Sequence, residues 1–305
     1  STTTHTHNSN QRNTMSMDLN AYLTSGARWI EAELDRRVPP ADTRPATLHA
    51  AMRHSLFAGG KRLRPILCAA AATACGAPRE AALLPAAAIE CLHTYTLIHD
   101  DLPCMDDDDL RRGVPTCHKV YGEAIALLAG DALQALAFQL AAQTPVAALE
   151  IVRELAAAAG SQAVVGGQVE DMLSEGQPPD AERLRYIQQH KTGDLLACAV
   201  RMGVLAAAGT PAALAAATTY GQAIGEAFQI ADDILDATAT TAQLGKTAGS
   251  DAAREKNTAV SVYGLDGARA LLQERVEQAL AALADFPGDT APLAALARHI
   301  ATRKN

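Results

Sequence analysis

Six aspartates lie within ten positions of the chain, at 100–101 and again at 106–109. They follow directly on the segment 81–98, which is apolar on nearly all sides and is therefore predicted to be a central helix. A solvated acidic loop is one interpretation of such a run. However, carboxylates at the end of a buried helix are costly without a cation, and Arg111 and Arg112 come directly after the run. The cluster is thus a candidate cation site.

A second acidic cluster, Asp232, Asp233 and Asp236, lies inside a helical pattern that covers 213–234 and continues beyond it. Asp232 and Asp236 are four residues apart and share a helix face, where like charges repel unless a cation lies between them. Proteins bind Mg²⁺ through a few carboxylates together with phosphate oxygens of a substrate. Two such clusters facing each other therefore predict a magnesium site for a phosphorylated substrate.

A glycine-rich turn with basic residues, Gly59-Gly60-Lys61-Arg62-Leu63-Arg64-Pro65, precedes another predicted helix. Such a turn can hold an anion through its side chains and the N–H groups of the helix start. Taken alone it is a weak signal, because an ordinary helix can also begin with basic residues. Lys191-Thr192 and Lys246 are further candidates for contacts with phosphate.

The elements that must position these residues are predicted to be helices. Aromatic residues make up only 4% of the 305 residues, and the abundance of alanine suits close-packed helices better than strands. Helical periodicity begins at Leu19–Arg37, and glycine and proline then divide the chain into about ten helices. The breaks are expected at Gly59-Gly60, 76–78, Leu102-Pro103, Thr144-Pro145, 176–179, Thr210-Pro211, 245–249 and Pro287-Gly288. No strand and no internal linker is predicted. We expect one domain over residues 18–305, after a polar and disordered tail over 1–17.

Composition excludes several other classes of protein. The formal net charge is −8, whereas a nucleic-acid-binding protein is expected to be basic. The longest uncharged stretch, 202–225, is interrupted by Gly209-Thr210-Pro211, which predicts a helix start, so no membrane span is expected. The six cysteines form no Cys-x-x-Cys pair. They predict buried thiols in a reducing compartment, with neither disulfides nor a zinc site.

The order of these motifs resembles the trans-prenyltransferases, and among them the bacterial-type farnesyl diphosphate synthases. The resemblance covers the chain from about Leu19 to Asn305 and rests on 59–65, 100–106, 111–113, Gly166-Gly167-Gln168, Lys191-Thr192, Phe228-Gln229 with 232–236, and Gly245-Lys246. It implies an all-α fold, a single bundle of helices around a central cavity. It also implies a short-chain enzyme that condenses isopentenyl diphosphate with dimethylallyl or geranyl diphosphate to farnesyl diphosphate.

The resemblance assigns a role to each candidate residue. It implies that three Mg²⁺ ions bridge the allylic diphosphate and that Asp100, Asp106 and Asp232 are their ligands. It places Arg111, Lys191 and Lys246 on the allylic diphosphate, and Lys61, Arg64, His93 and Arg112 on isopentenyl diphosphate. Thr192 and Gln229 would supply weakly nucleophilic dipoles beside the allylic cation. The catalytic group is then Lys191, Thr192, Gln229 and Lys246.

The spacing of the first acidic motif predicts that the helix is interrupted within it. Asp100 and Asp106 are six residues apart, and six residues of an unbroken helix turn by about 600°, which would point the two side chains to different faces. Pro103 must therefore end or bulge the helix if both carboxylates are to reach the same ions.

Tyr95 is the candidate for setting product length. It lies five residues before Asp100, about 7 to 8 Å further along the helix axis. An aromatic side chain at that depth would form the floor of an apolar tunnel, and by the resemblance this arrangement accompanies a C15 product. Ordinary core packing is the alternative role for Tyr95.

Other functions remain open at this stage. A geranylgeranyl or geranyl diphosphate synthase would share nearly all of these motifs. A terpene cyclase would share the acidic motifs but would not need Lys61, Arg64 and His93. A non-catalytic subunit on the same fold would have no use for two complete acidic motifs.

The resemblance also implies features beyond the site itself. We expect the segment 238–258, with Lys246, to close over bound substrates as a lid. The basic end of the chain, Arg303-Lys304, would assist that closure. A homodimer and a cytoplasmic location are expected as well.

Overall fold

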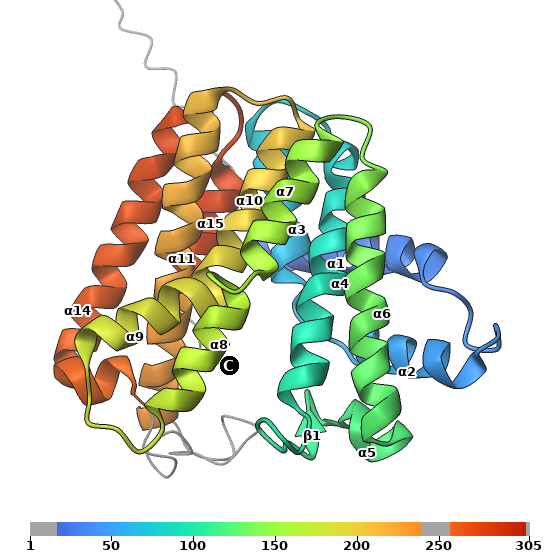
Figure 1. The fold of residues 1–305 in the computed structure, drawn as a ribbon. Coiled ribbons are helices and arrows are strands. Elements are labelled where there is room, and N and C mark those ends of the chain that lie inside the picture. The colour runs from blue at the N-terminus through green and yellow to red at the C-terminus, as the bar shows by residue number, and fades with distance from the viewer. Residues whose placement is uncertain (1–16, 239–256, 303–305) are drawn as a thin grey trace, which may run out of the picture.

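The computed structural model describes residues 17–238 and 257–302, and helices form almost all of this part (Figure 1). The helices are α1 (Leu19–Arg37), α2 (Ala46–Leu56), α3 (Leu63–Ala74), α4 (Leu83–Asp100), α5 (Cys117–Tyr121), α6 (Glu123–Ala142), α7 (Ala148–Ala159), α8 (Val164–Ser174), α9 (Ala181–Ile187), α10 (Asp194–Ala206), α11 (Pro211–Thr238), α14 (Ala259–Ala282) and α15 (Ala291–Thr302). The all-α fold expected from the sequence is confirmed.

Local sequence explains where several helices begin. The Asp18 carboxylate accepts a hydrogen bond from the N–H of Ala21 at the start of α1. Thr210 caps α11 by accepting from the N–H of Ala213 at 3.1 Å, and Pro211 occupies the first turn, where its missing N–H is not needed. These caps satisfy donors that have no partner inside the helix.

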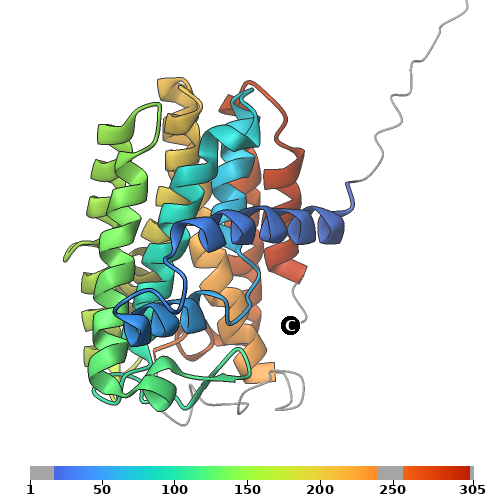
Figure 2. The ribbon, with the colours of Figure 1, turned by 90° about the vertical axis from the view of Figure 1, so that its right-hand side faces the viewer.

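The core consists of two apolar clusters that meet inside the bundle. One gathers buried residues of α1, α2, α4, α6 and α7. The other gathers buried residues of α3, α10, α11, α14 and α15. Most helices run nearly parallel or antiparallel to one another, whereas α1 crosses the outside of the bundle (Figure 2). The bundle can therefore enclose a cavity between α4 on one side and α11 on the other.

The two helices predicted to be central end on the same side of the bundle. The carboxyl ends of α4 and α11 both lie at the lower end in Figure 1, together with the hairpin that follows α4. Both acidic motifs are located at these helix ends. The topology thus brings the two halves of the predicted site to one end of the molecule.

Three local features differ from the sequence expectation. Strands β1 (Leu110–Arg111) and β2 (Val114–Pro115) pair antiparallel, and each is too short to produce an alternating pattern. Gly122, with a φ of 83°, separates α5 from α6. Residues Gln188–Gly193 form a π-helical turn between α9 and α10, and such turns occur often at functional sites.

Within residues 17–238 and 257–302, two helices are long and apolar enough to cross a membrane by length and composition. The segment Arg79–Asp100, which contains α4, is 67% buried inside the bundle over its most apolar window, and α6 is 39% buried. The sequence singles out a different stretch, 202–225, as the longest without charge. Core helices pass the same test of length and hydropathy, and α4 is such a helix here.

Candidate active site

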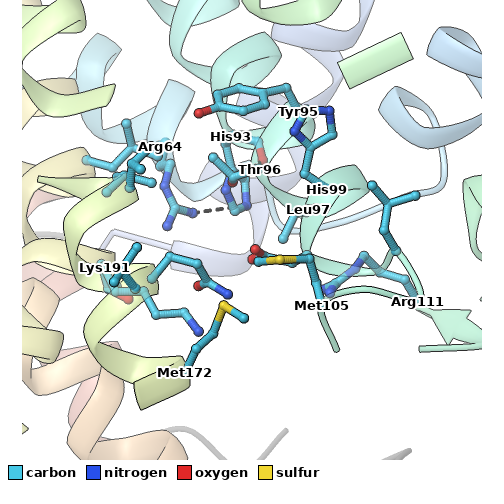
Figure 3. Close-up of a pocket in the computed structure, with 18 of the residues that line it drawn as sticks. Arg64, His93, Tyr95, Thr96, Leu97, His99, Met105, Arg111, Met172 and Lys191 are labelled. Atoms are coloured by element: carbon cyan, nitrogen blue, oxygen red, sulfur yellow. Dashed lines mark hydrogen bonds between the residues drawn. The ribbon is translucent and has the colours of Figure 1, made fainter. Parts of the chain in front are cut away.

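A cavity of about 670 Å³ lies between α4, α8, α10 and α11. One end is lined by charged side chains, which include Asp100, Arg111 and Lys191. Apolar side chains of α8 and the ring of Tyr95 also line the cavity. In the close-up, Tyr95 lies at one end of the pocket and Lys191, Met105 and Arg111 lie at the other (Figure 3). The cavity therefore has a polar head and an apolar body.

The first acidic motif folds into a turn at the polar head. Helix α4 ends at Asp100, and the N–H of Asp106 donates to the carbonyl of Asp100 at 2.8 Å. The six-residue interval is thus closed by a turn that contains Pro103, as the spacing requires. Burial raises the pKa of Asp100 to about 6, with Lys191 opposing the shift and the charge of Asp106 adding to it. Asp100 and Asp106 therefore lie within each other's electrostatic field.

Arg111 is oriented by a carboxylate of the same motif. Its Nε atom donates to both oxygens of Asp101, at 2.9 and 2.8 Å, and a terminal nitrogen donates to Oδ1 at 2.6 Å. Asp101 is buried, whereas Arg111 lines the cavity. This forked pair holds the guanidinium at the polar head.

Lys191 enters the cavity from the π-helical turn. Its ammonium donates to Asp171 of α8 at 2.5 Å. Burial lowers the pKa of Lys191, but the charges of Asp171, Asp100 and Asp106 outweigh it and the net shift is upward, so the cation is retained. The turn approaches α8 closely at Gly167. A Cβ atom added there would lie 2.2 Å from the backbone nitrogen of Lys191. The motif Gly166-Gly167-Gln168 thus has a packing role.

Helix α11 contributes the opposite wall. The Gln229 amide nitrogen donates to the Thr192 hydroxyl oxygen at 2.9 Å, and both side chains line the cavity. Asp232 lies one helical turn beyond Phe228 and therefore shares its face of the helix. Asp233 accepts a hydrogen bond from the N–H of Ala259 at 2.7 Å, which ties α11 to the start of α14.

A second cavity of about 350 Å³ adjoins the first. It is lined by residues from α3, α4, α11 and α15 and from the hairpin between β1 and β2. All four residues that the sequence assigns to isopentenyl diphosphate line it, namely Lys61, Arg64, His93 and Arg112. Arg64, His93, Arg112 and Phe228 border both cavities. The two cavities thus share one wall.

The shared wall is cationic and incompletely paired. Arg64 donates to Nε2 of His93 at 3.2 Å, so the imidazole is a neutral acceptor at that atom. Burial, and then the charge of Arg64, hold the pKa of His93 well below its usual range. Burial lowers the pKa of Arg64 to about 10. The Nε atom of Arg64 is buried without a hydrogen-bond partner among the described residues, and an anion in the second cavity would supply one.

Sequence reasoning missed two carboxylates, Glu90 and Asp171, that pair with basic residues lining the two cavities. Arg62 is buried in the left-handed region (φ 49°) and pairs with the buried Glu90 of α4 at 2.8 Å. It also donates to the carbonyl of Leu56 at 2.6 Å. Asp171, the partner of Lys191, is the second missed group. Neither Glu90 nor Asp171 lies in a recognisable pattern, and only the tertiary contacts reveal their roles.

The donor set at the polar head fits a magnesium–diphosphate group. Among residues 17–238 and 257–302, no three His, Cys, Asp or Glu side chains converge closely enough to hold a metal ion by themselves. Mg²⁺ does not need such a cage, since one or two carboxylates and substrate phosphates suffice. The half-buried, mutually repelling carboxylates of Asp100 and Asp106 are hard oxygen donors of this kind.

Several candidates lie outside the residues that the structure describes. These are Lys246, nearly all of the expected lid 238–258, the expected tail 1–17 except for its last residue, and Arg303-Lys304. Among the described candidates, Asp106 and Asp232 do not line the first cavity. They lie on the turn after α4 and on α11, two elements that do contribute to its lining.

Residues 45–287 match the family model described as "Polyprenyl synthetase". A relative from Arabidopsis thaliana, "Geranylgeranyl pyrophosphate synthase 12, chloroplastic", is 44% identical over 97% of this chain and 84% of its own length. Another from the same plant, "Heterodimeric geranylgeranyl pyrophosphate synthase large subunit 1, chloroplastic", is 43% identical over 98% of this chain and 83% of its own length. These names contradict the expected cytoplasmic location, because both relatives are chloroplastic proteins.

A solved structure supports the same family assignment. The apo structure of an FPP/GFPP synthase from Zymomonas mobilis has a TM-score of 0.83 with this chain and 37% identity, and it covers 94% of this chain and 100% of its own. The fold, the cavity lined by Asp100 of the first acidic motif and the family match agree. The chain belongs to the polyprenyl synthetase family and is a prenyltransferase of the trans-isoprenyl diphosphate synthase type.

Proposed function

We propose that the chain joins isopentenyl diphosphate to an allylic diphosphate in a magnesium-dependent reaction. The observation that carries this proposal is the pair of adjoining cavities with a shared cationic wall. Two diphosphate substrates need two anion sites, whereas a terpene cyclase needs one. The first cavity, with its polar head and apolar body, suits the allylic substrate, and the second suits isopentenyl diphosphate.

The residues of the first cavity support ionisation of the allylic substrate. Asp100, Asp106 and Asp232 would hold Mg²⁺, which acts as a Lewis acid on the leaving diphosphate when bound. Arg111 and Lys191 neutralise charge as it develops on that diphosphate.

The same cavity protects the cation that ionisation produces. The Thr192 hydroxyl and the Gln229 amide present dipoles to it without forming a bond, since neither is a strong nucleophile. The apolar body excludes water. Attack by the isopentenyl double bond forms the new carbon–carbon bond, and a proton then leaves the neighbouring carbon to restore a double bond. We assign no side chain as the base.

A direct assay tests the proposal. The protein would be incubated with Mg²⁺, isopentenyl diphosphate and dimethylallyl, geranyl or farnesyl diphosphate, and the dephosphorylated alcohols would be sized. We expect longer alcohols only when both substrates and Mg²⁺ are present. A cyclic hydrocarbon from an allylic diphosphate alone would contradict the proposal and support a terpene cyclase.

For the product, we propose geranylgeranyl diphosphate, because the two similar relatives from Arabidopsis thaliana are named geranylgeranyl pyrophosphate synthases. This replaces farnesyl diphosphate, which was the expectation from the sequence. Farnesyl diphosphate is the second candidate, favoured by the buried ring of Tyr95 in the cavity wall. Tyr95→Ala should then lengthen the product, and a C15 alcohol as the main wild-type product would favour the second candidate.

We also propose that the chain forms a homodimer through α6. This helix exposes Leu128 (51% exposed) on an apolar element that is only partly buried. Leu128→Glu should convert a dimer to a monomer in light scattering after size exclusion, whereas Leu173→Glu on α8 should not. A monomeric wild-type protein would contradict the proposal. One relative is named as a subunit of a heterodimer, so association with a different chain would be a separate outcome.

A further inference from the structure

Tyr95 does not stand alone in the cavity wall. Its ring is 7% exposed and packs against the imidazole of His99, one helical turn later on α4. The ring centroids are 5.4 Å apart and the planes lie at 85°, which is the edge-to-face arrangement that aromatic pairs prefer. His99 also lines the cavity, and it points toward Tyr95 in the close-up (Figure 3).

His99 is fixed on its other side by the backbone of α6. Its Nε2 atom donates to the carbonyl of Leu127 at 3.0 Å. The carboxylate of Asp131 lies 3.9 Å from the same nitrogen. The imidazole therefore spans the seam between α4 and α6, with one edge on Tyr95 and one nitrogen on α6.

A notch in α6 makes room for this ring. At Gly130 an added Cβ atom would lie 2.2 Å from Nε2 of His99 and 2.5 Å from its Cδ2. Any other residue at this position would expel the imidazole. Gln134, one turn further along α6, lies close enough to Tyr95 to oppose the rise that burial causes in the pKa of the tyrosine hydroxyl. Leu127, Gly130 and Gln134 thus form one stripe of α6 that holds Tyr95 and His99 in place.

We propose that His99 is a positioning residue for product length, because it braces the ring of Tyr95 against α6 and so fixes where the cavity ends. The inference rests on the proposed function, in which the apolar body of the cavity holds a growing chain. Without the brace, the Tyr95 ring can turn toward α6 and the cavity deepens. Longer chains then fit before release.

His99 also precedes Asp100 directly, so a change of His99 alone is ambiguous. Gly130→Ala resolves this, since it displaces the imidazole from the α6 side and leaves residues 99 and 100 unaltered. A matched control exists elsewhere in the chain. His54 also packs edge-to-face on a tyrosine, Tyr121, and is within 2.8 Å of the carbonyl oxygen of Pro115, but neither ring lines the first cavity.

The test compares product lengths of His99→Ala, Gly130→Ala, Tyr95→Ala, the double variant Tyr95→Ala/His99→Ala and the control His54→Ala. The readout is the ratio of the alcohol one C5 unit longer than the main wild-type product to that product. We expect His99→Ala and Gly130→Ala to raise this ratio by roughly three- to tenfold, the range that corresponds to one aromatic pair. His54→Ala should leave it unchanged.

The double variant separates bracing from an independent effect. It should match Tyr95→Ala alone, because a brace has no effect once the braced ring is gone. His99→Phe, which keeps a ring in the notch without the hydrogen bond, should fall between the wild type and His99→Ala. If a variant does not fold, as judged by thermal unfolding, the remaining variants still decide the question.

Three results would overturn the brace. They are an unchanged ratio in both His99→Ala and Gly130→Ala, lower turnover of His99→Ala with an unchanged ratio, and extra lengthening in the double variant. The second would show that His99 acts through Asp100. Failure of the proposed function would give a different result. In that case the wild-type protein itself would not form any prenyl alcohol longer than that of the allylic substrate.

Discussion

Asp100 is unfavourable to the fold while it is ionised. Burial raises its pKa to about 6, with Asp106 adding to the shift against the opposing charge of Lys191. The pKa of Asp100 is higher in the folded state than in the unfolded state. Its favourable contribution to the free energy of unfolding is therefore complete below about pH 4 and is lost as the pH rises through 6.

Asp100→Asn should therefore stabilise the metal-free protein at neutral pH. We expect the free energy of unfolding at pH 7.5, in the presence of a chelator, to rise by about 1–2 kcal/mol. The gain should shrink toward zero as the pH is lowered to 4, and prenyl transfer should be lost. Urea unfolding at several pH values measures the effect. A less stable variant at pH 7.5 would show that the cost of burying Asp100 is compensated elsewhere.

His93 makes the opposite contribution to the pH dependence. Burial and the charge of Arg64 hold its pKa well below the usual range, so the folded state resists protonation of the ring while the unfolded state accepts it. The contribution of His93 to the free energy of unfolding is therefore fully present above about pH 6.5, and it falls as the pH drops below this value. His93→Gln should lose less stability than the wild type between pH 7.5 and 5.5. Equal losses in urea unfolding would contradict this assignment.

At the scale of elements, the π-helical turn Gln188–Gly193 positions Lys191 and Thr192 together. It can do so only because Gly167 lets the turn approach α8. Gly167→Ala should lower the free energy of unfolding by about 1–3 kcal/mol, since the new Cβ would meet backbone atoms that cannot move alone. It should also lower kcat/KM for the allylic substrate. Gly160→Ala is the control, because its nearest contact would be 3.3 Å. Equal effects of the two variants would show that close approach is not what matters.

The sequence predicts elements better than it predicts contacts between them. The bounds of α1, the cap at Thr210 and the end of α4 before Pro103 follow from periodicity and local chemistry. The two-residue strands and the π-helical turn leave no periodic signal, because they are shorter than a pattern needs. Asp171 and Glu90 gain their roles only from partners on other helices. Such long-range pairings are set by packing, which a single sequence does not display.

At the scale of the whole molecule, ligand binding should be visible as added stability. Inorganic pyrophosphate with Mg²⁺ should bind the folded chain alone, and at a hundredfold excess over its Kd this adds about 2.7 kcal/mol to the free energy of unfolding. Thermal unfolding with and without the pair measures this. A chelator should abolish the shift, and Lys191→Ala should reduce it. A shift of equal size with pyrophosphate in chelator would contradict a magnesium requirement.

The shared wall should link the apparent affinities of the protein for its two substrates. Arg64, His93 and Arg112 border both cavities, whereas Lys61 borders one and Lys191 the other. Replacing a residue that borders both should change the apparent affinities for donor and acceptor together. Replacing Lys61 or Lys191 should change only one. The enzyme would then distinguish its two substrates by the residues that border only one cavity. Through the shared wall, binding of one substrate would change the affinity for the other.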